Sequence, residues 1–186
     1  MAPASVTVVI PTKNEEGLIG EIVDSVRPYG DVLVIDGHST DATRKVAEAH
    51  GARVVLDGGR GKGQAIRQAF NDATTDIVVF IDADGSHDPK DIPGLVAPIA
   101  AGTADLVIGS RGKGGSDELH GTLGQFIRYV GSQLIMLAIN YRWGVRLSDS
   151  QNGFRAIRRD VGKALDLRSN LTTIEQEMLT RALKRG

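Results

Sequence analysis

Residues 77–85 read Ile-Val-Val-Phe-Ile-Asp-Ala-Asp-Gly, an unbroken apolar run that ends in two aspartates. Such a run predicts a strand that is buried on both faces of a parallel sheet. In these sheets the chemistry lies at the carboxyl ends of the strands, where the connecting loops meet. Asp82 and Asp84 would there offer oxygen ligands to a hard divalent cation, Mg²⁺ or Mn²⁺, that holds a substrate's phosphates. The alternative is that both aspartates only cap the turn before the next helix.

The first 110 residues repeat this alternation of apolar runs and helical patterns. The expected strands are Val6–Ile10, Val32–Ile35, Arg53–Leu56, Ile77–Ile81 and Leu106–Ile108. The expected helices contain Leu18–Val26, Ala42–Ala49 and Lys62–Ala73, and a fourth begins near Asp88-Pro89, a capping acceptor followed by a first-turn proline. Ser39 or Asp41 would start the second helix. The alternation predicts an α/β fold with a mostly parallel sheet and helices on both faces.

The pattern changes after Ser110. A polar segment with Gly112–Gly115 is long enough to serve as a lid or a substrate flap. Helices are then expected over Gln125–Tyr141 and Thr173–Lys184, with a compact loop at Ser148–Gly153 between them. No strand follows the last helix, so we expect that the natural chain continues beyond this point.

Composition excludes several classes of function. The 186 residues suit one domain, and a formal charge of −1 with a pI near 6.4 gives no field for nucleic-acid binding. The chain has no cysteine, which fits a reducing compartment. Pro11 and Lys13 interrupt the first apolar run, so it is not a signal peptide. No run of apolar residues is long enough to span a bilayer.

Five polar loops carry residues that suit a nucleotide diphosphate. They are Pro11–Glu15, Asp36–Asp41, Gly61–Gly63, Asp82–Gly85 and Asp149–Arg155. The first four follow expected strands and precede expected helices, so they should share one edge of the sheet. Asp36 would accept from a base N–H or a ribose hydroxyl, and the helix start at Lys62 suits an anion. Spacing alone does not place the fifth loop.

These motifs also carry a resemblance to a known family. In chain order they are Pro-x-x-Asn-Glu, Asp-Gly-x-Ser-x-Asp-x-Thr, Gly-Lys-Gly-x-Ala, Asp-Ala-Asp-Gly, Gly-Ser-Arg and Asp-x-x-x-Gly-Phe-Arg. From Val8 to about Lys184 the chain resembles the family-2 inverting glycosyltransferases, and within them the dolichol- or polyprenol-phosphate mannosyl- and glucosyltransferases. The resemblance implies one GT-A domain over residues 1–186, with a nucleotide-binding half (1–110) and an acceptor half (111–186) that is truncated at its C-terminus.

The resemblance implies substrates, a cofactor and roles for individual residues. The donor would be of the GDP-mannose or UDP-glucose type, the acceptor a polyprenyl phosphate, the metal Mg²⁺ or Mn²⁺, and the location cytoplasmic, at the cytoplasmic face of a membrane. Nucleotide-sugar binding falls to Pro11, Asn14, Glu15, Asp36, Lys62, Asp82 and Gln151. Metal binding falls to Asp82 and Asp84, the acceptor phosphate to Arg111, Arg128 and Ser132, and the catalytic roles to Asp84, Asp149 and Arg155.

Three residues depart from the family's pattern. Lys13 stands where an aromatic residue is frequent, which puts base stacking in doubt. Gly37 replaces the second residue of a commoner Asp-Asp pair. Ser86 stands where polyprenol-phosphate enzymes often carry a glutamine near the metal, so the coordination of the metal would differ.

The nature of the acceptor decides which chemistry is needed. A polyprenyl phosphate is already anionic, so its transfer needs positioning and stabilisation of the leaving group more than a base. An acceptor with a neutral hydroxyl needs a general base, for which Asp149 is the candidate. The apolar residues of Phe126–Ile139 also predict a helix at the bilayer surface, with packing against the sheet as the alternative.

Two other functions compete with glycosyl transfer. One is a nucleotidyltransferase that makes the sugar nucleotide, although the chain has no Gly-rich basic loop near its N-terminus. The other is a nucleotide-sugar-binding module without catalytic activity.

Overall fold

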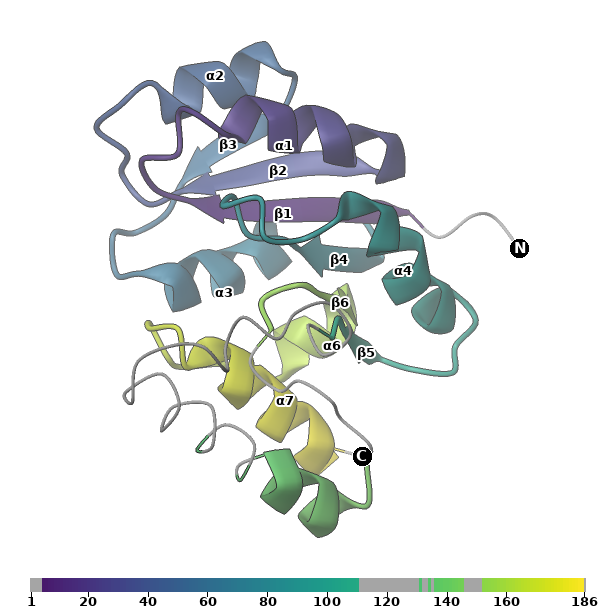
Figure 1. The fold of residues 1–186 in the computed structure, drawn as a ribbon. Coiled ribbons are helices and arrows are strands. Elements are labelled where there is room, and N and C mark those ends of the chain that lie inside the picture. The colour runs from purple at the N-terminus through teal and green to yellow at the C-terminus, as the bar shows by residue number, and fades with distance from the viewer. Residues whose placement is uncertain (1–4, 111–130, 132–133, 135, 146–151, 186) are drawn as a thin grey trace, which may run out of the picture.

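The computed structural model describes residues 5–110, 131, 134, 136–145 and 152–185. Their centre is a six-stranded sheet with the strand order β3-β2-β1-β4-β6-β5 (Figure 1). The strands are β1 (Val6–Thr12), β2 (Asp31–Asp36), β3 (Arg53–Leu56), β4 (Ile77–Phe80), β5 (Leu106–Ile108) and β6 (Arg155–Arg158). All five strands that the sequence predicted are therefore present, together with a sixth that it did not predict.

The first four strands are parallel, and β6 runs antiparallel to both β4 and β5. The register pairs Phe80 at the end of β4 with Arg155 at the start of β6. The loop that enters β6 therefore reaches the edge of the sheet at which the parallel strands end. This pairing places the end of the fifth polar loop beside Asp82. The spacing of the motifs in the sequence did not predict this position.

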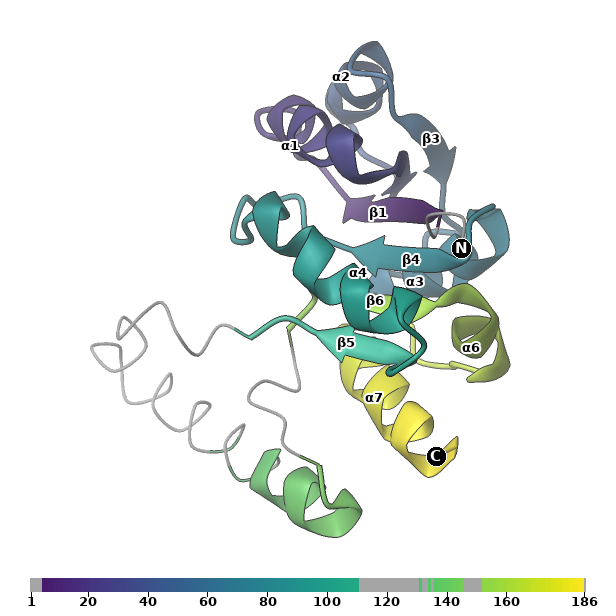
Figure 2. The ribbon, with the colours of Figure 1, turned by 90° about the vertical axis from the view of Figure 1, so that its right-hand side faces the viewer.

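Helices cover both faces of the sheet, as predicted (Figure 2). They are α1 (Ile19–Val26), α2 (Thr43–Ala49) and α4 (Ile92–Ala100) on one face, and α3 (Lys62–Asp72), α6 (Arg159–Ala164) and α7 (Ile174–Arg185) on the other. Two short 3₁₀ helices, η1 (Arg27–Tyr29) and η2 (Pro89–Asp91), precede β2 and α4. Side chains of the central strand β1 alternate between the two cores, with Val8 and Ile10 in one and Val9 in the other.

Asp41 and Asp88 each bond a backbone N–H at the start of a helix. The side chain of Asp41 accepts the N–H of Thr43 at 3.0 Å at the start of α2, whereas the Ser39 hydroxyl accepts the N–H of Asn14. Of the two predicted residues, Asp41 is thus the one whose side chain bonds the first turn of α2, although Ala42 is the N-cap residue. The Asp88 carboxylate accepts the N–H of Lys90 and opens η2, which leads into α4.

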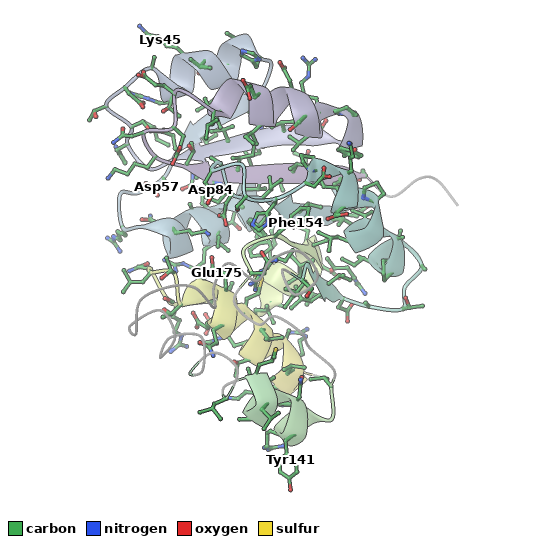
Figure 3. The ribbon with its side chains drawn as sticks, in the orientation of Figure 1. Lys45, Asp57, Asp84, Tyr141, Phe154 and Glu175 are labelled. Carbon is green, nitrogen blue, oxygen red and sulfur yellow. The ribbon has the colours of Figure 1, made fainter. Side chains whose placement is uncertain are left out.

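Residues 136–143 are helical, in agreement with part of the helix predicted over Gln125–Tyr141. This helix lies at the end of the molecule away from α2, and Tyr141 points away from the body (Figures 1 and 3). Leu134, Leu137 and Tyr141 are exposed by 63%, 69% and 92%. In the part of the chain that the structure describes, no helix has both the length and the apolar character to cross a bilayer.

Candidate functional site: a cleft at the ends of the parallel strands

A cleft of about 420 Å³ opens where the parallel strands end. Its lining comprises Pro11, Thr12, Lys13, Glu15, Ile35, Gly37, Asp57, Gly59, Gly61, Lys62, Ala65, Asp82, Ala83 and Asp84. The first four predicted loops therefore meet at one edge of the sheet. Pro11, Glu15, Lys62, Asp82 and Asp84 line this cleft, whereas Asn14 and Asp36 are not part of its lining.

Asn14 joins the first two loops to each other. Its backbone has a φ of 57°, in the left-handed region that asparagine tolerates better than most residues. The side-chain Oδ1 accepts the N–H of Thr40 at 2.8 Å, and the backbone N–H donates to the Ser39 hydroxyl at 2.8 Å. These bonds hold the loops after β1 and β2 together, so Asn14 shapes this end of the cleft from outside its lining.

Asp36 is completely buried between the cleft residues Ile35 and Gly37. Its Oδ1 accepts the N–H of Ser39 at 2.8 Å and lies 3.8 Å from Nε of Arg44. Its Oδ2 is buried and has no hydrogen-bond partner among the described residues. A buried acceptor without a partner is costly, so this oxygen marks a place where a ligand's N–H or O–H would be favourable.

The middle of the cleft holds a cluster of charges around Lys62. Its Nζ lies 2.6 Å from Oδ1 of Asp82 and 2.9 Å from Oε1 of Glu175. Burial acts to lower the pKa of Lys62, but the two carboxylates outweigh it and raise the pKa. The ammonium therefore stays charged and is shared between two carboxylates.

Glu175 is a site residue that the sequence reasoning missed. It lies in the first turn of α7 (Figure 3), its side chain is 6% exposed, and its Oε2 has no hydrogen-bond partner among the described residues. One signal could have revealed it. Glu175 shares helical spacing with Met178, Leu179 and Ala182, so a carboxylate stands within the apolar stripe of α7.

Asp82 is held from three sides. Lys62 pairs with its Oδ1, and Nε2 of His87 lies 3.7 Å from its Oδ2. The backbone of Gly153 packs so closely that a Cβ there would collide with Oδ2. Burial acts to raise the pKa of Asp82, but His87 and Lys62 outweigh it and lower the pKa to about 2. The carboxylate is therefore ionised at neutral pH.

Asp84 is more open than Asp82. It is exposed, and its Oδ1 accepts the N–H of Ser86 at 3.0 Å within its own loop. Gly85 between them has a φ of 73°, which lets the loop turn at this point.

These residues fit a hard divalent cation. Asp82 and Asp84 both offer carboxylate oxygens, the ligands that Mg²⁺ and Mn²⁺ prefer. Among the described residues, no group of three or more histidine, cysteine or acidic side chains converges on one point. The described chain would thus supply two ligands and leave the remaining positions to phosphate oxygens and water, which is how Mg²⁺ is usually held beside a nucleotide.

The turn at Gly61-Lys62-Gly63 begins α3, as the sequence predicted. Gly61 has a φ of 104°, and the N–H of Gly63 donates to the carbonyl of Asn170 at 3.0 Å. The expectation that this helix start leaves its backbone N–H groups free for an anion is thus wrong for Gly63. The ammonium of Lys62 is the cationic group that this turn brings into the cleft.

Arg155 is completely buried behind the cleft. Its Nε donates to the carbonyl of Asn152 at 3.0 Å, and Nη1 donates to the carbonyl of Glu175 at 2.8 Å. Nη2 also donates to the carbonyl of Asn152. The guanidinium thus ties the start of β6 to the first turn of α7. These contacts indicate a structural role, and the predicted catalytic contact of Arg155 stays a prediction.

The remaining predicted residues lie outside the described part of the chain. They are Arg111, Arg128, Ser132, Asp149 and Gln151. Their neighbours Gly109 and Asn152 are described, and they are bonded to each other. The side-chain amide of Asn152 donates to the carbonyl of Gly109 at 2.9 Å, so these two described residues lie side by side.

A mixed α/β sheet with an acidic cleft at the ends of its parallel strands is typical of nucleotide-binding domains. Residues 7–165 match the family described as Glycosyl transferase family 2, and the chain belongs to this family. The predicted family is therefore confirmed.

The chain is similar to several named proteins. It is 37% identical to glycosyltransferase AglJ of Haloferax volcanii over 187 residues, which cover 99% of this chain and 60% of AglJ. It is 38% identical to the undecaprenyl-phosphate mannosyltransferase of Micrococcus luteus over 178 residues, which cover 87% of this chain and 70% of the relative. The chain thus spans less than two thirds of the length of AglJ.

The fold is also similar to a solved structure. Glucosyl-3-phosphoglycerate synthase from Mycobacterium tuberculosis, in complex with Mn²⁺, UDP-glucose and phosphoglyceric acid, superposes with a TM-score of 0.77 at 29% identity. The superposition covers 99% of this chain and 67% of that structure. The predicted GT-A fold is therefore confirmed.

Proposed function

We propose that this chain forms the donor site of a metal-dependent inverting hexosyltransferase. The observation that carries the proposal is the cluster of Asp82, Asp84 and Lys62 in one cleft, where two carboxylates suit a cation and an ammonium suits a diphosphate. The Mn²⁺ and UDP-glucose in the similar synthase support the same assignment. Family membership favours glycosyl transfer over the nucleotidyltransferase alternative.

The donor would lie along the cleft with its nucleoside near the first two loops. Glu15 lines that end of the cleft, and the unpartnered oxygen of Asp36 lies behind it. Pro11 and Asn14 fix the shape of this region. The diphosphate would then lie beside Lys62 and Asp84, in the middle of the cleft. In this division, residues 1–110 bind the nucleotide and residues 111–186 contribute the acceptor side.

Transfer with inversion requires an acceptor oxygen to attack the anomeric carbon as the bond from that carbon to the diphosphate oxygen breaks. The nucleoside diphosphate then leaves with an additional negative charge. Lys62 would stabilise this charge, because its ammonium lies in the cleft and remains protonated. A cation bound to Asp82 and Asp84 would supply further neutralisation of the leaving group.

The proposed acceptor is a polyprenyl phosphate. The undecaprenyl-phosphate mannosyltransferase of M. luteus supports this choice, since it shares 38% identity with the chain. The exposed Leu134, Leu137 and Tyr141 have the spacing of one helix face and would rest on the cytoplasmic surface of a membrane. Arg111, Arg128 and Ser132 would receive the phosphate.

A soluble acceptor is the second candidate. The similar synthase holds phosphoglyceric acid, a small soluble molecule, in its structure. If the acceptor carries a neutral hydroxyl, a general base is required, and Asp149 is the proposed one.

A transfer assay separates the two acceptors. The protein is incubated with Mn²⁺ and labelled UDP-glucose or GDP-mannose, either with undecaprenyl phosphate in detergent or with phosphoglyceric acid. Label in the lipid fraction, lost in Asp84→Ala, is the expected result. Transfer only to the soluble acceptor would replace the lipid proposal, and absence of transfer to either would leave the binding module as the better description.

A further inference from the structure

His87 has an almost buried side chain that lies between Asp82, in the acidic loop Asp82–Gly85, and Phe154, the residue before β6. The imidazole is 8% exposed, and its Nε2 lies 3.7 Å from Oδ2 of Asp82. Its ring stacks on Phe154, with the ring centroids 5.2 Å apart and the planes inclined by 22°. The distance to Asp82 is slightly longer than a hydrogen bond, so a small movement of either side chain would close it.

Phe154 is a fixed support for this ring. It is 3% exposed, its N–H donates to Oδ1 of Asn152 at 2.9 Å, and its carbonyl accepts the N–H of Gly109 at 2.9 Å. The ring of His87 therefore rests on a residue that is bonded to the residue after β5 and to the loop before β6. The stack limits the positions that the imidazole can take relative to Asp82.

The ammonium of Lys62 cannot keep its ion pair with Asp82 unchanged and also bind the oxygens of a diphosphate. Its ammonium pairs with Asp82 at 2.6 Å. Once a diphosphate draws Lys62 toward its own oxygens, His87 is the polar side chain that stays beside Asp82 among the described residues. The orientation of the carboxylate would then depend on His87 and on the close backbone of Gly153.

We propose that His87 is a positioning residue that orients the Asp82 carboxylate toward the cation and the diphosphate, with Phe154 as its support. This role rests on the proposed function of the cleft. Partners that orient a ligating group typically contribute about 10–100-fold to metal affinity. His87 would act through Asp82 and would not itself contact the cation.

Two substitutions separate this role from simple packing. His87→Phe keeps an aromatic ring that can stack on Phe154 but removes the nitrogen that faces Asp82. His87→Gln gives up the stack but keeps a side-chain N–H donor. His50→Phe is the control, because His50 pairs with Asp24 at 2.8 Å outside the lining of the cleft.

The readout is the affinity for Mn²⁺ in the presence of UDP, measured by electron paramagnetic resonance of free Mn²⁺, together with the melting temperature. We expect His87→Phe to weaken Mn²⁺ binding by about 10–100-fold without lowering the melting temperature. His87→Gln should recover most of the affinity, and His50→Phe should bind as the wild type does.

Mn²⁺ binding by His87→Phe at the wild-type affinity would overturn the proposal for His87 while leaving the proposed metal site intact. Equal losses in both His87 variants, in step with their melting temperatures, would show that the residue only packs. Absence of Mn²⁺ binding by the wild-type protein would overturn the metal-dependent function itself, and the role of His87 with it.

Discussion

Lys62 and Asp82 form an ion pair of 2.6 Å that joins the start of α3 to the end of β4. The pair places an ammonium beside one carboxylate of the acidic loop, and Glu175 holds the same ammonium from α7 at 2.9 Å. Three elements of the fold thus fix one cation-anion cluster in the cleft. The proposed binding of a diphosphate by Lys62 depends on this arrangement.

Replacing Lys62 should weaken the binding of a nucleoside diphosphate. We expect Lys62→Met to raise the dissociation constant of UDP or GDP by about 10–100-fold, because hydrogen bonds to charged groups contribute about 1.5–3 kcal/mol. Calorimetric titration in the presence of Mn²⁺ measures the change. Lys45→Met on α2, outside the cleft lining, is the matched control. Equal affinities of Lys62→Met and the control would refute a phosphate contact by Lys62.

Adding one methyl group at Gly153 should disturb Asp82 directly. A Cβ at this position would collide with Oδ2 of Asp82, so Gly153→Ala is expected to weaken Mn²⁺-dependent nucleotide binding by about tenfold or more. Gly94→Ala in α4 is the control, since a Cβ there meets open space. The control should bind normally and gain about 1 kcal/mol in stability from its better helix propensity. Unchanged nucleotide binding by Gly153→Ala would show that the Asp82 side chain can move away from the added methyl group without weakening the binding.

Asp36 and Glu15 are predicted to bind the nucleoside and not the sugar. Asp36→Ala should therefore weaken the binding of UDP or GDP as much as it weakens the binding of the corresponding nucleotide sugar, because the lost contact is common to both ligands. Asp31→Ala, at the other end of β2, serves as the control. A loss confined to the sugar-bearing ligand would place Asp36 at the sugar instead.

Replacing Arg155 should lower the stability of the fold, and any effect on catalysis should be secondary to this loss. Its guanidinium is fully buried and holds the carbonyls of Asn152 and Glu175. We expect Arg155→Met to lower the free energy of unfolding by about 3 kcal/mol in urea titrations, because buried acceptors lose their donors. Arg158→Met, which breaks exposed ion pairs with Asp105 and Asp160, should cost much less stability, because solvent screens exposed pairs. A stable Arg155→Met protein that binds donor but does not turn over would instead support the catalytic role.

Sequence patterns predicted the parallel part of the fold because β1, β2 and β4 are buried on both faces and are almost continuously apolar. They did not predict β6, whose sequence Arg-Ala-Ile-Arg has two apolar residues. Its burial comes from insertion between β4 and β5, two strands that are distant from it in the chain. Pairing of this kind depends on long-range contacts that no local pattern reveals.

The candidate site was predicted unevenly for a similar reason. Asp82, Asp84 and Lys62 stand at the ends of recognisable strands or at the start of a recognisable helix, so the sequence placed them together. Glu175 and His87 act through contacts made by folding, an ion pair with Lys62 and a stack on Phe154. The charge of Arg155 and its place in a polar loop suggested an active-site residue. In the structure it is buried, and its guanidinium donates to the backbone carbonyls of Asn152 and Glu175.

The most direct test of the central claim is the metal dependence of donor binding at Asp84. The dissociation constants of UDP-glucose and GDP-mannose are measured by calorimetry with Mn²⁺ and with EDTA, for the wild-type protein and for Asp84→Ala. We expect one of the two donors to bind the wild type at least tenfold more tightly with Mn²⁺, and the difference to vanish in Asp84→Ala while the melting temperature is unchanged. Equal affinity with Mn²⁺ and with EDTA in the wild type, or a metal effect that survives in Asp84→Ala, would contradict the account.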